Sequence, residues 1–158
     1  METLKIKKSI EIQAPSQQVW EVLVNDDLNR LWLGEFSEGS YAETGWRQGS
    51  KVVFKDKSNS GMIGRVAVSR PYEAIEVEYE GMVIAGVEDY ASEEARQVQG
   101  GRETYYLIEK DGRTRLEIES DMSEEYFDQM SLAWEKALQQ IRQLVEKKEA
   151  AITDTPTN

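Results

Sequence analysis

The sequence of 158 residues contains no cysteine and no histidine. Without cysteine the chain has no disulfide and no thiolate, either as a nucleophile or as a metal ligand. Without histidine it has no Ser-His or Cys-His catalytic pair and no imidazole ligand for zinc. A general base would have to be Asp, Glu, Lys or Tyr, and no arrangement of these residues in the sequence indicates one. We therefore predict that the chain is not an enzyme and has no catalytic residue, no metal and no cofactor.

Basic residues are scarce as well. The 19 Lys and Arg residues face 30 Asp and Glu residues, which gives a net charge of −11. Nucleic acids and anionic membranes are bound by clusters of Lys and Arg, so we expect neither as a partner. No apolar run approaches the roughly 18 residues of a membrane span, and residues 1–5 lack the apolar segment of a secretion signal. These absences predict a soluble cytoplasmic protein.

The sequence also contains no motif typical of a phosphate-binding or calcium-binding loop. The 11 glycines include no cluster that follows a strand and opens a helix, as phosphate-binding loops do. Glu88-Asp89 and Glu93-Glu94 gather carboxylates, but they lack the alternating spacing and the central glycine of a calcium loop. We interpret this acidic stretch as solvated.

The strongest pattern that is present lies at residues 123–148. Apolar residues recur there with the spacing of one helix face. They are Tyr126, Phe127, Met130, Ala133, Trp134, Ala137, Leu138, Ile141, Leu144 and Val145. We predict one long C-terminal helix with a single buried stripe. Residues 150–158 lose this period and are predicted to form a disordered tail, which leaves residues 1–149 as one domain.

The chain before this helix alternates in the manner of strands. Residues 4–12 predict a first strand, and Ala14-Pro15 opens two short helices over residues 16–32. From residue 36 onward we expect about six further strands, with a bulge at Gly64 and a tight type I′ turn at Asp111-Gly112. Residues 86–101 do not follow this strand pattern, and we predict that they form an excursion from the sheet.

This order of elements predicts an α+β fold. A curved antiparallel sheet of about seven strands would wrap around the long C-terminal helix, with two short helices after the first strand. This arrangement is the helix-grip fold. Inside the excursion, Ser92 is placed to cap a short helix over residues 93–97.

Several short motifs, in order, resemble a known family. They are Ala14-Pro15 followed by Val19-Trp20, then Trp32, Trp46 with Gly49, Gly64-Arg65-Val66, Glu103-Thr104-Tyr105 with Thr114-Arg115-Leu116, and Trp134-Glu135-Lys136-Ala137-Leu138. Over residues 4–148 the chain resembles the START-like (SRPBCC) superfamily, which includes the birch pollen allergen. Within it, the chain is similar to the family named after the activator of the ninety-kilodalton heat-shock protein ATPase. Members of the superfamily bind lipids, hormones or metabolites, cyclise polyketides, or bind chaperones.

The sequence is rich in large, adaptable apolar side chains, which suit a pocket for a hydrophobic ligand. Together with the resemblance, this predicts a cavity between the sheet and the C-terminal helix. The candidate ligand-binding residues are Trp20, Trp32, Trp46, Phe54, Met62, Tyr79, Met82, Tyr90, Tyr105, Tyr126, Met130, Trp134 and Leu138. The alternative for each is a place in a filled core.

Two functions follow from these observations. The first is non-enzymatic binding of a small hydrophobic molecule. The second is a protein-interaction module that resembles the heat-shock-protein ATPase activator and would act as a co-chaperone. A homodimer is retained as an assembly to be tested.

Overall fold

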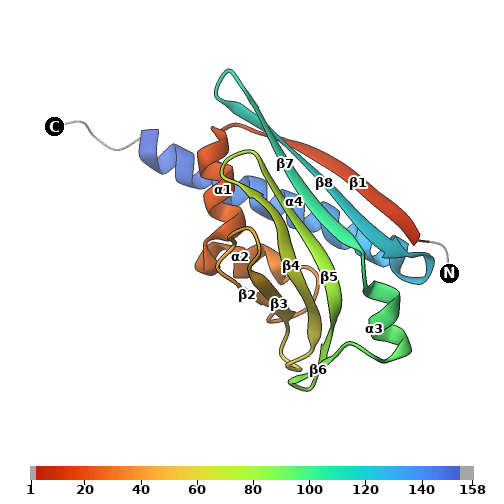
Figure 1. Cartoon of the computed structure of the whole chain (residues 1–158). Helices are drawn as coiled ribbons and strands as arrows, with labels where there is room; N and C mark the ends of the chain where they lie inside the picture. The colour runs from red at the N-terminus through yellow and green to blue at the C-terminus, as the bar shows by residue number, and fades with distance from the viewer. Residues whose placement is uncertain (1–2, 154–158) are drawn as a thin grey trace.

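The computed structural model describes residues 3–153, which form one antiparallel sheet and a set of helices (Figure 1). In chain order the elements are β1 (Thr3–Ile12), α1 (Ser16–Val24), α2 (Asp26–Leu33), β2 (Tyr41–Glu43), β3 (Lys51–Lys55), β4 (Gly61–Arg70), β5 (Ala74–Ile84), β6 (Val87–Asp89), α3 (Glu93–Val98), β7 (Arg102–Lys110), β8 (Arg113–Ser123), the 3₁₀ turn η1 (Glu124–Tyr126) and α4 (Phe127–Thr153).

The sheet has eight strands in the order β1-β8-β7-β5-β4-β3-β2, and β6 pairs with the end of β5. The long helix α4 packs mainly against β1, α1 and α2, so that these helices share one face of the sheet, here called the inner face. The predicted helix-grip fold is confirmed. The eighth strand is β6, which lies within the excursion and has only three residues.

The C-terminal helix begins and ends later than predicted. Ser123 still belongs to β8 because it pairs with Thr3 of β1, and η1 separates it from α4. At the other end the helix continues to Thr153, since residues 150–152 are the good helix formers Ala-Ala-Ile. Part of the predicted disordered tail is therefore helical, and residues 154–158 lie outside the described part of the chain.

The predicted buried stripe of α4 is present, with Tyr126 as the exception. Ala133, Trp134, Ala137, Leu138, Ile141 and Val145 are buried in the core. Tyr126 lies in η1 and its side chain is 48% exposed. Lys8, which breaks the apolar alternation of β1, causes no bulge. Its strand pairs with β8 in unbroken register, and its Nζ lies 2.8 Å from Glu135 Oε1 on α4.

Local signals account for the connections. Asp111 and Gly112 both have positive φ angles, of 54° and 77°, which confirms the predicted tight turn between β7 and β8. The register of β4 against β5 shifts between Ile63 and Gly64, which confirms the predicted bulge. The Ser92 side chain accepts a hydrogen bond from the Ala95 amide at 3.1 Å, so the predicted cap of α3 is also confirmed.

The two N-terminal helices are tied to each other by a buried side chain. Asn25 caps α2 by accepting a hydrogen bond from the Leu28 amide, and Pro15 precedes α1 as its N-cap. From α2, Trp32 donates its Nε1–H to the carbonyl oxygen of Val22 in α1 at 3.0 Å. Within residues 3–153, no helix is long and apolar enough to cross a membrane.

Candidate functional site

A row of aromatic side chains lies on the inner face of the sheet, away from the tightest packing of α4. Trp46 precedes β3, Phe54 lies in β3 and Tyr79 in β5. The ring centroids of Trp46 and Phe54 are 6.4 Å apart, and those of Phe54 and Tyr79 are also 6.4 Å apart. All three pack against the core and remain partly exposed. They therefore present an apolar surface as well as filling the interior.

Two methionines extend this row. Met62 of β4 pairs with Phe54, and Met82 of β5 pairs with Met62. Directly opposite residues in antiparallel strands point to the same side, so both methionines face inward. Both are partly exposed, as is Met130 near the start of α4. We call the set Trp46, Phe54, Met62, Tyr79 and Met82 the inner apolar surface.

A carboxylate lies beside this surface. Glu103 of β7 is partly buried and accepts two hydrogen bonds, from the Tyr79 hydroxyl at 3.1 Å and from the Tyr105 hydroxyl at 2.8 Å. Tyr105 is 3% exposed, and its ring lies 5.8 Å from that of Trp134 on α4. The Tyr79–Glu103–Tyr105 cluster thus connects the inner apolar surface to the closed core.

Burial dominates the electrostatics of this cluster. It raises the pKa of Glu103 above its ordinary value, against the hydrogen bonds from Tyr105 and Tyr79, which lower it. Burial, the charge of Glu103 and the hydrogen bond to it hold the pKa of Tyr79 well above its ordinary value. The same causes, with Tyr79 as a further neighbour, raise the pKa of Tyr105. Both phenols therefore stay protonated while Glu103 titrates.

We expect Glu103→Gln to gain stability relative to the parent protein as the pH rises. A raised pKa means that the folded chain holds this proton more tightly than the unfolded chain. The contribution of Glu103 to folding is thus present at low pH and is lost as the pH rises through its folded pKa. Gln carries no charge and keeps hydrogen-bonding atoms for Tyr79 and Tyr105. Urea denaturation of both proteins between about pH 4.5 and about pH 8 measures the difference.

The control for this measurement is Glu78→Gln, which removes a carboxylate on β5 whose nearest cationic partner is Arg102 at 3.9 Å. The difference in free energy of unfolding between Glu78→Gln and the parent should not rise with pH in the way expected for Glu103→Gln. A difference between the parent and Glu103→Gln that stays constant with pH would contradict the prediction.

Eight of the predicted ligand-binding residues are linked to this cluster by strand pairing or ring contacts. They are Trp32, Trp46, Phe54, Met62, Tyr79, Met82, Tyr105 and Trp134. Of these, Trp32, Tyr105 and Trp134 are buried in the core. Of the other five, Leu138 is buried in the core, Met130 packs against the core from α4, and Tyr126 is exposed beside α4.

Trp20 and Tyr90 lie elsewhere for reasons of topology. The ring of Trp20, on α1, lies 6.1 Å from that of Tyr72 in the β4–β5 turn. Tyr90 follows β6 on the outer face of the sheet, where its ring lies close to Gly81 and its hydroxyl donates a hydrogen bond to Glu88. Neither side chain shares a surface with the inner set.

Glu103 is a site residue that the sequence patterns did not single out. Glu103, Tyr105 and Leu107 occupy alternate positions of β7, and both apolar members are buried. An acidic residue on the apolar side of a strand is a readable signal, because buried carboxylates are rare without a specific partner. Glu103-Thr104-Tyr105 is one of the motifs of the family resemblance, but that resemblance alone assigns Glu103 no role at a binding site.

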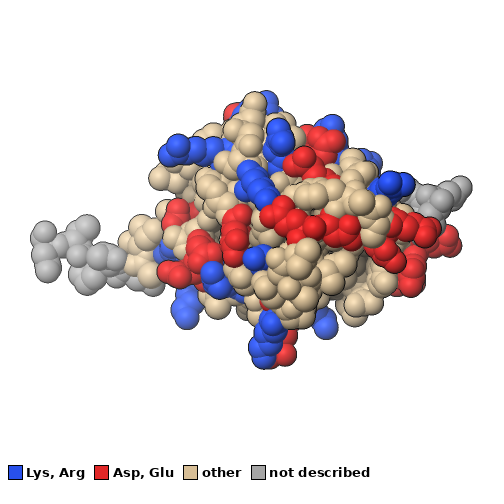
Figure 2. Space-filling model, turned by 60° about the horizontal axis from the view of Figure 1, so that its bottom comes forward, with Lys and Arg blue, Asp and Glu red and all other residues tan. Residues whose placement is uncertain are grey.

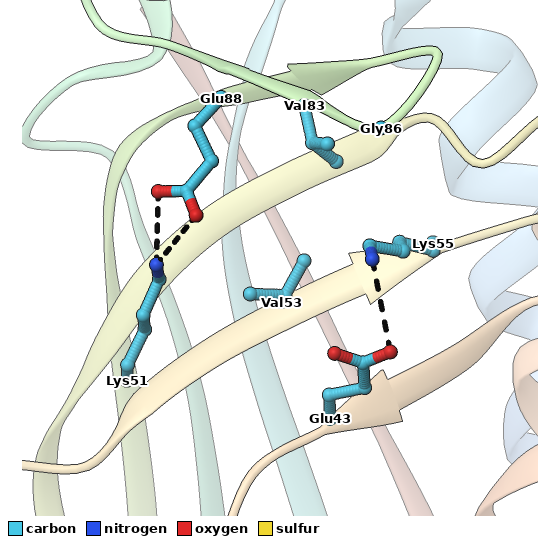
Figure 3. A pocket seen from close by; sticks show the side chains of 7 residues that line it. All are labelled: Glu43, Lys51, Val53, Lys55, Val83, Gly86 and Glu88. Carbon is cyan, nitrogen blue, oxygen red and sulfur yellow. Dashed lines mark hydrogen bonds and ion pairs between the residues drawn. The ribbon is translucent and has the colours of Figure 1, made fainter.

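Two hollows of about 250 Å³ each lie on the outer face. Figure 3 shows the first, in which Lys51 pairs with both carboxylate oxygens of Glu88 at 2.8 Å and Lys55 lies 3.7 Å from Glu43. These exposed ion pairs cross strands, and Val53 and Val83 lie between them in the hollow. Among the described side chains, no group of three Asp or Glu residues is placed so that it could hold a metal ion.

Comparison with known proteins gives one family and a consistent set of folds. The model of the family described as Activator of Hsp90 ATPase homolog 1-like protein matches residues 13–146. No curated protein matches the chain in sequence. The crystal structure of protein MLL2253 from Mesorhizobium loti is 13% identical with a TM-score of 0.69, over 92% of this chain and 98% of that one.

Two further solved structures are similar. The solution structure of the Aha1 dimer from Colwellia psychrerythraea is 14% identical with a TM-score of 0.69, over 90% of this chain and 96% of that one. The crystal structure of CalU16 from Micromonospora echinospora is 16% identical with a TM-score of 0.62, over 95% of this chain and 86% of that one. At these identities the likeness concerns the fold.

The family match runs from the residue after β1 into the last turns of α4, so it includes both helices of the N-terminal part, the remaining strands and the Tyr79–Glu103–Tyr105 cluster. The helix-grip topology and the similar solved structures agree with it. The chain belongs to the family of Activator of Hsp90 ATPase homolog 1-like proteins, within the START-like superfamily.

Proposed function

We propose that this protein binds a small hydrophobic molecule, without catalysis, on the inner apolar surface. The observation that carries the proposal is the partial exposure of large apolar side chains that already pack in a row. Phe54, Met62 and Met82 are neighbours across three strands, and Trp46 and Tyr79 extend the row on either side of Phe54. Met and aromatic side chains adapt to ligands of different shape.

We expect at least one apolar compound to stabilise the protein. A ligand that binds the folded chain alone raises the free energy of unfolding by about 2.7 kcal/mol at a hundredfold excess over Kd. A thermal-shift screen of fatty acids, sterols, flavonoids and polyketides measures this, and the same compound should quench tryptophan emission. Met130→Trp should weaken binding more than it changes stability, because Met130 packs against the same core as Phe54 and Tyr79 and a larger ring there would take up space that the ligand needs.

Leu132→Trp is the matched control, since Leu132 lies on the same helix with 52% of its side chain exposed. It should leave the affinity unchanged. A screen without any stabiliser would overturn the proposal.

A second function, docking to a protein partner as a co-chaperone, is favoured by the tip of the β5–β6 hairpin. Ile84 and Val87 flank its turn and are 51% and 68% exposed. If the ligand screen finds no stabiliser, we would favour this second function over ligand binding. The Colwellia protein is described as a dimer, and on that likeness we extend the proposal to a homodimer, which sedimentation velocity would detect.

A further inference from the structure

In the described part of the chain, no cation pairs with the Glu103 carboxylate. Every ion pair among residues 3–153 joins other groups, and the neighbours that affect the pKa of Glu103 include no cation. Arg102, adjacent in sequence, pairs instead with Glu76 at 2.8 Å and Glu78 at 3.9 Å. By contrast, the charged side chain of Lys8 has a partner of opposite charge, because its Nζ lies 2.8 Å from Glu135 Oε1 on α4.

The hydrogen bonds of Glu103 leave room for a further donor. An ionised carboxylate offers about four lone-pair sites. The structure uses two of them, one on each oxygen, for the Tyr79 and Tyr105 hydroxyls. Glu103 is partly exposed and is not enclosed in the core. An incoming N–H group would complete the coordination of the carboxylate.

The surroundings of Glu103 favour a cation over an anion. Through their hydroxyls, Tyr79 and Tyr105 bring two aromatic residues to the carboxylate, and aromatic rings attract ammonium groups. The net charge of −11 adds a long-range attraction, and Figure 2 shows acidic side chains gathered in a band across one face. A ligand carboxylate placed at this point would be repelled by Glu103.

We infer that the ligand of the inner apolar surface is an amine, whose ammonium group pairs with the Glu103 carboxylate while its apolar body contacts Phe54, Met62 and Met82. This inference rests on the proposed function and narrows it from any hydrophobic molecule to one class. The two phenols hold the carboxylate in place, and the aromatic rings flank the ammonium group.

The test uses three probes with the same apolar body: phenylbutylamine, phenylbutanol and phenylbutyrate. Tryptophan fluorescence titration gives their dissociation constants. We expect the amine to bind at least about tenfold more tightly than the alcohol, because a hydrogen bond between charged groups is stronger than one between neutral groups. The carboxylate should bind most weakly of the three. Glu103→Gln should remove the preference for the amine, and Glu78→Gln should keep it.

A second measurement needs no variant. Binding measured with the parent protein at a series of pH values should show that the affinity for the amine falls as Glu103 becomes protonated, whereas the affinity for the alcohol stays constant. Equal affinity for the amine and the alcohol, or an amine preference that survives Glu103→Gln, would overturn the inference and leave the proposed function standing. Binding of none of the three probes would overturn the inference, and the thermal-shift screen would still decide the proposed function.

Discussion

Trp134→Ala is expected to lower the free energy of unfolding by about 3–5 kcal/mol. The side chain is 2% exposed. Its ring lies 4.8 Å from that of Phe36, after α2, and 5.8 Å from that of Tyr105 in β7, in both cases edge to face. Truncation removes both contacts and leaves a cavity where α4, the N-terminal helices and the sheet meet. Urea denaturation followed by circular dichroism measures the loss.

Leu132→Ala provides the comparison on the same helix. Leu132 is 52% exposed, so its truncation should change stability by no more than about 0.5 kcal/mol. A loss below about 1 kcal/mol for Trp134→Ala would mean that this face of α4 contributes little to the core. It would also mean that the link between Tyr105 and α4, on which the position of Glu103 depends, is weak.

The features predicted correctly from the sequence are those set by neighbouring residues. The stripe of α4 from Ala133 to Val145 follows from helical spacing, and Asp111-Gly112 specifies its own turn through two positive φ angles. Ser92 caps α3 with its own hydroxyl. The ends of α4 were less predictable, because pairing of Ser123 with Thr3 holds it in β8.

The site depends on how strands pair, and alternation along one strand does not determine this. Tyr79 and Met82 are three residues apart, so a regular strand would place them on opposite faces. The bulge leaves Glu80 without a partner in β4, because Ile63 pairs with Gly81 and Gly64 with Tyr79. Tyr79 and Met82 therefore both face inward. Tyr90 follows Asp89, which pairs with the inward-facing Met82, so the side chain of Tyr90 lies on the outer face.

The site around Glu103 is likewise only partly predictable from alternation along one strand. Its place on the buried side of β7 is readable from alternation with Tyr105 and Leu107. The second phenol comes from β5, which is paired with β7 through Val77 opposite Glu103. Tyr79 lies two residues after Val77 and so faces the same side as Glu103. The meeting of Tyr79 with Glu103 therefore requires the pairing of β5 with β7, which the sequence does not predict.

Gly64→Ala is expected to destabilise the protein by about 1–3 kcal/mol. A Cβ atom at this position would lie 2.6 Å from the carbonyl oxygen of Glu78 and 3.1 Å from Cγ1 of Val77. Glu78 cannot withdraw, because β5 is paired on its other side with β7. The two strands would have to separate at the bulge, which displaces Tyr79 and weakens its hydrogen bond to Glu103. Binding of phenylbutylamine should therefore fall together with stability.

Gly34→Ala is the matched substitution without a clash. Gly34 has a helical φ of −57°, and an added Cβ would meet only the Arg30 carbonyl oxygen, at the ordinary contact distance of 3.7 Å. Its effect on the free energy of unfolding should stay within about 0.5 kcal/mol, and affinity for the probe should not change. Equal urea midpoints for the two variants would show that β4 and β5 can separate at Gly64 without cost. The close pairing of Gly64 with Tyr79 would then not be what holds Tyr79 against Glu103.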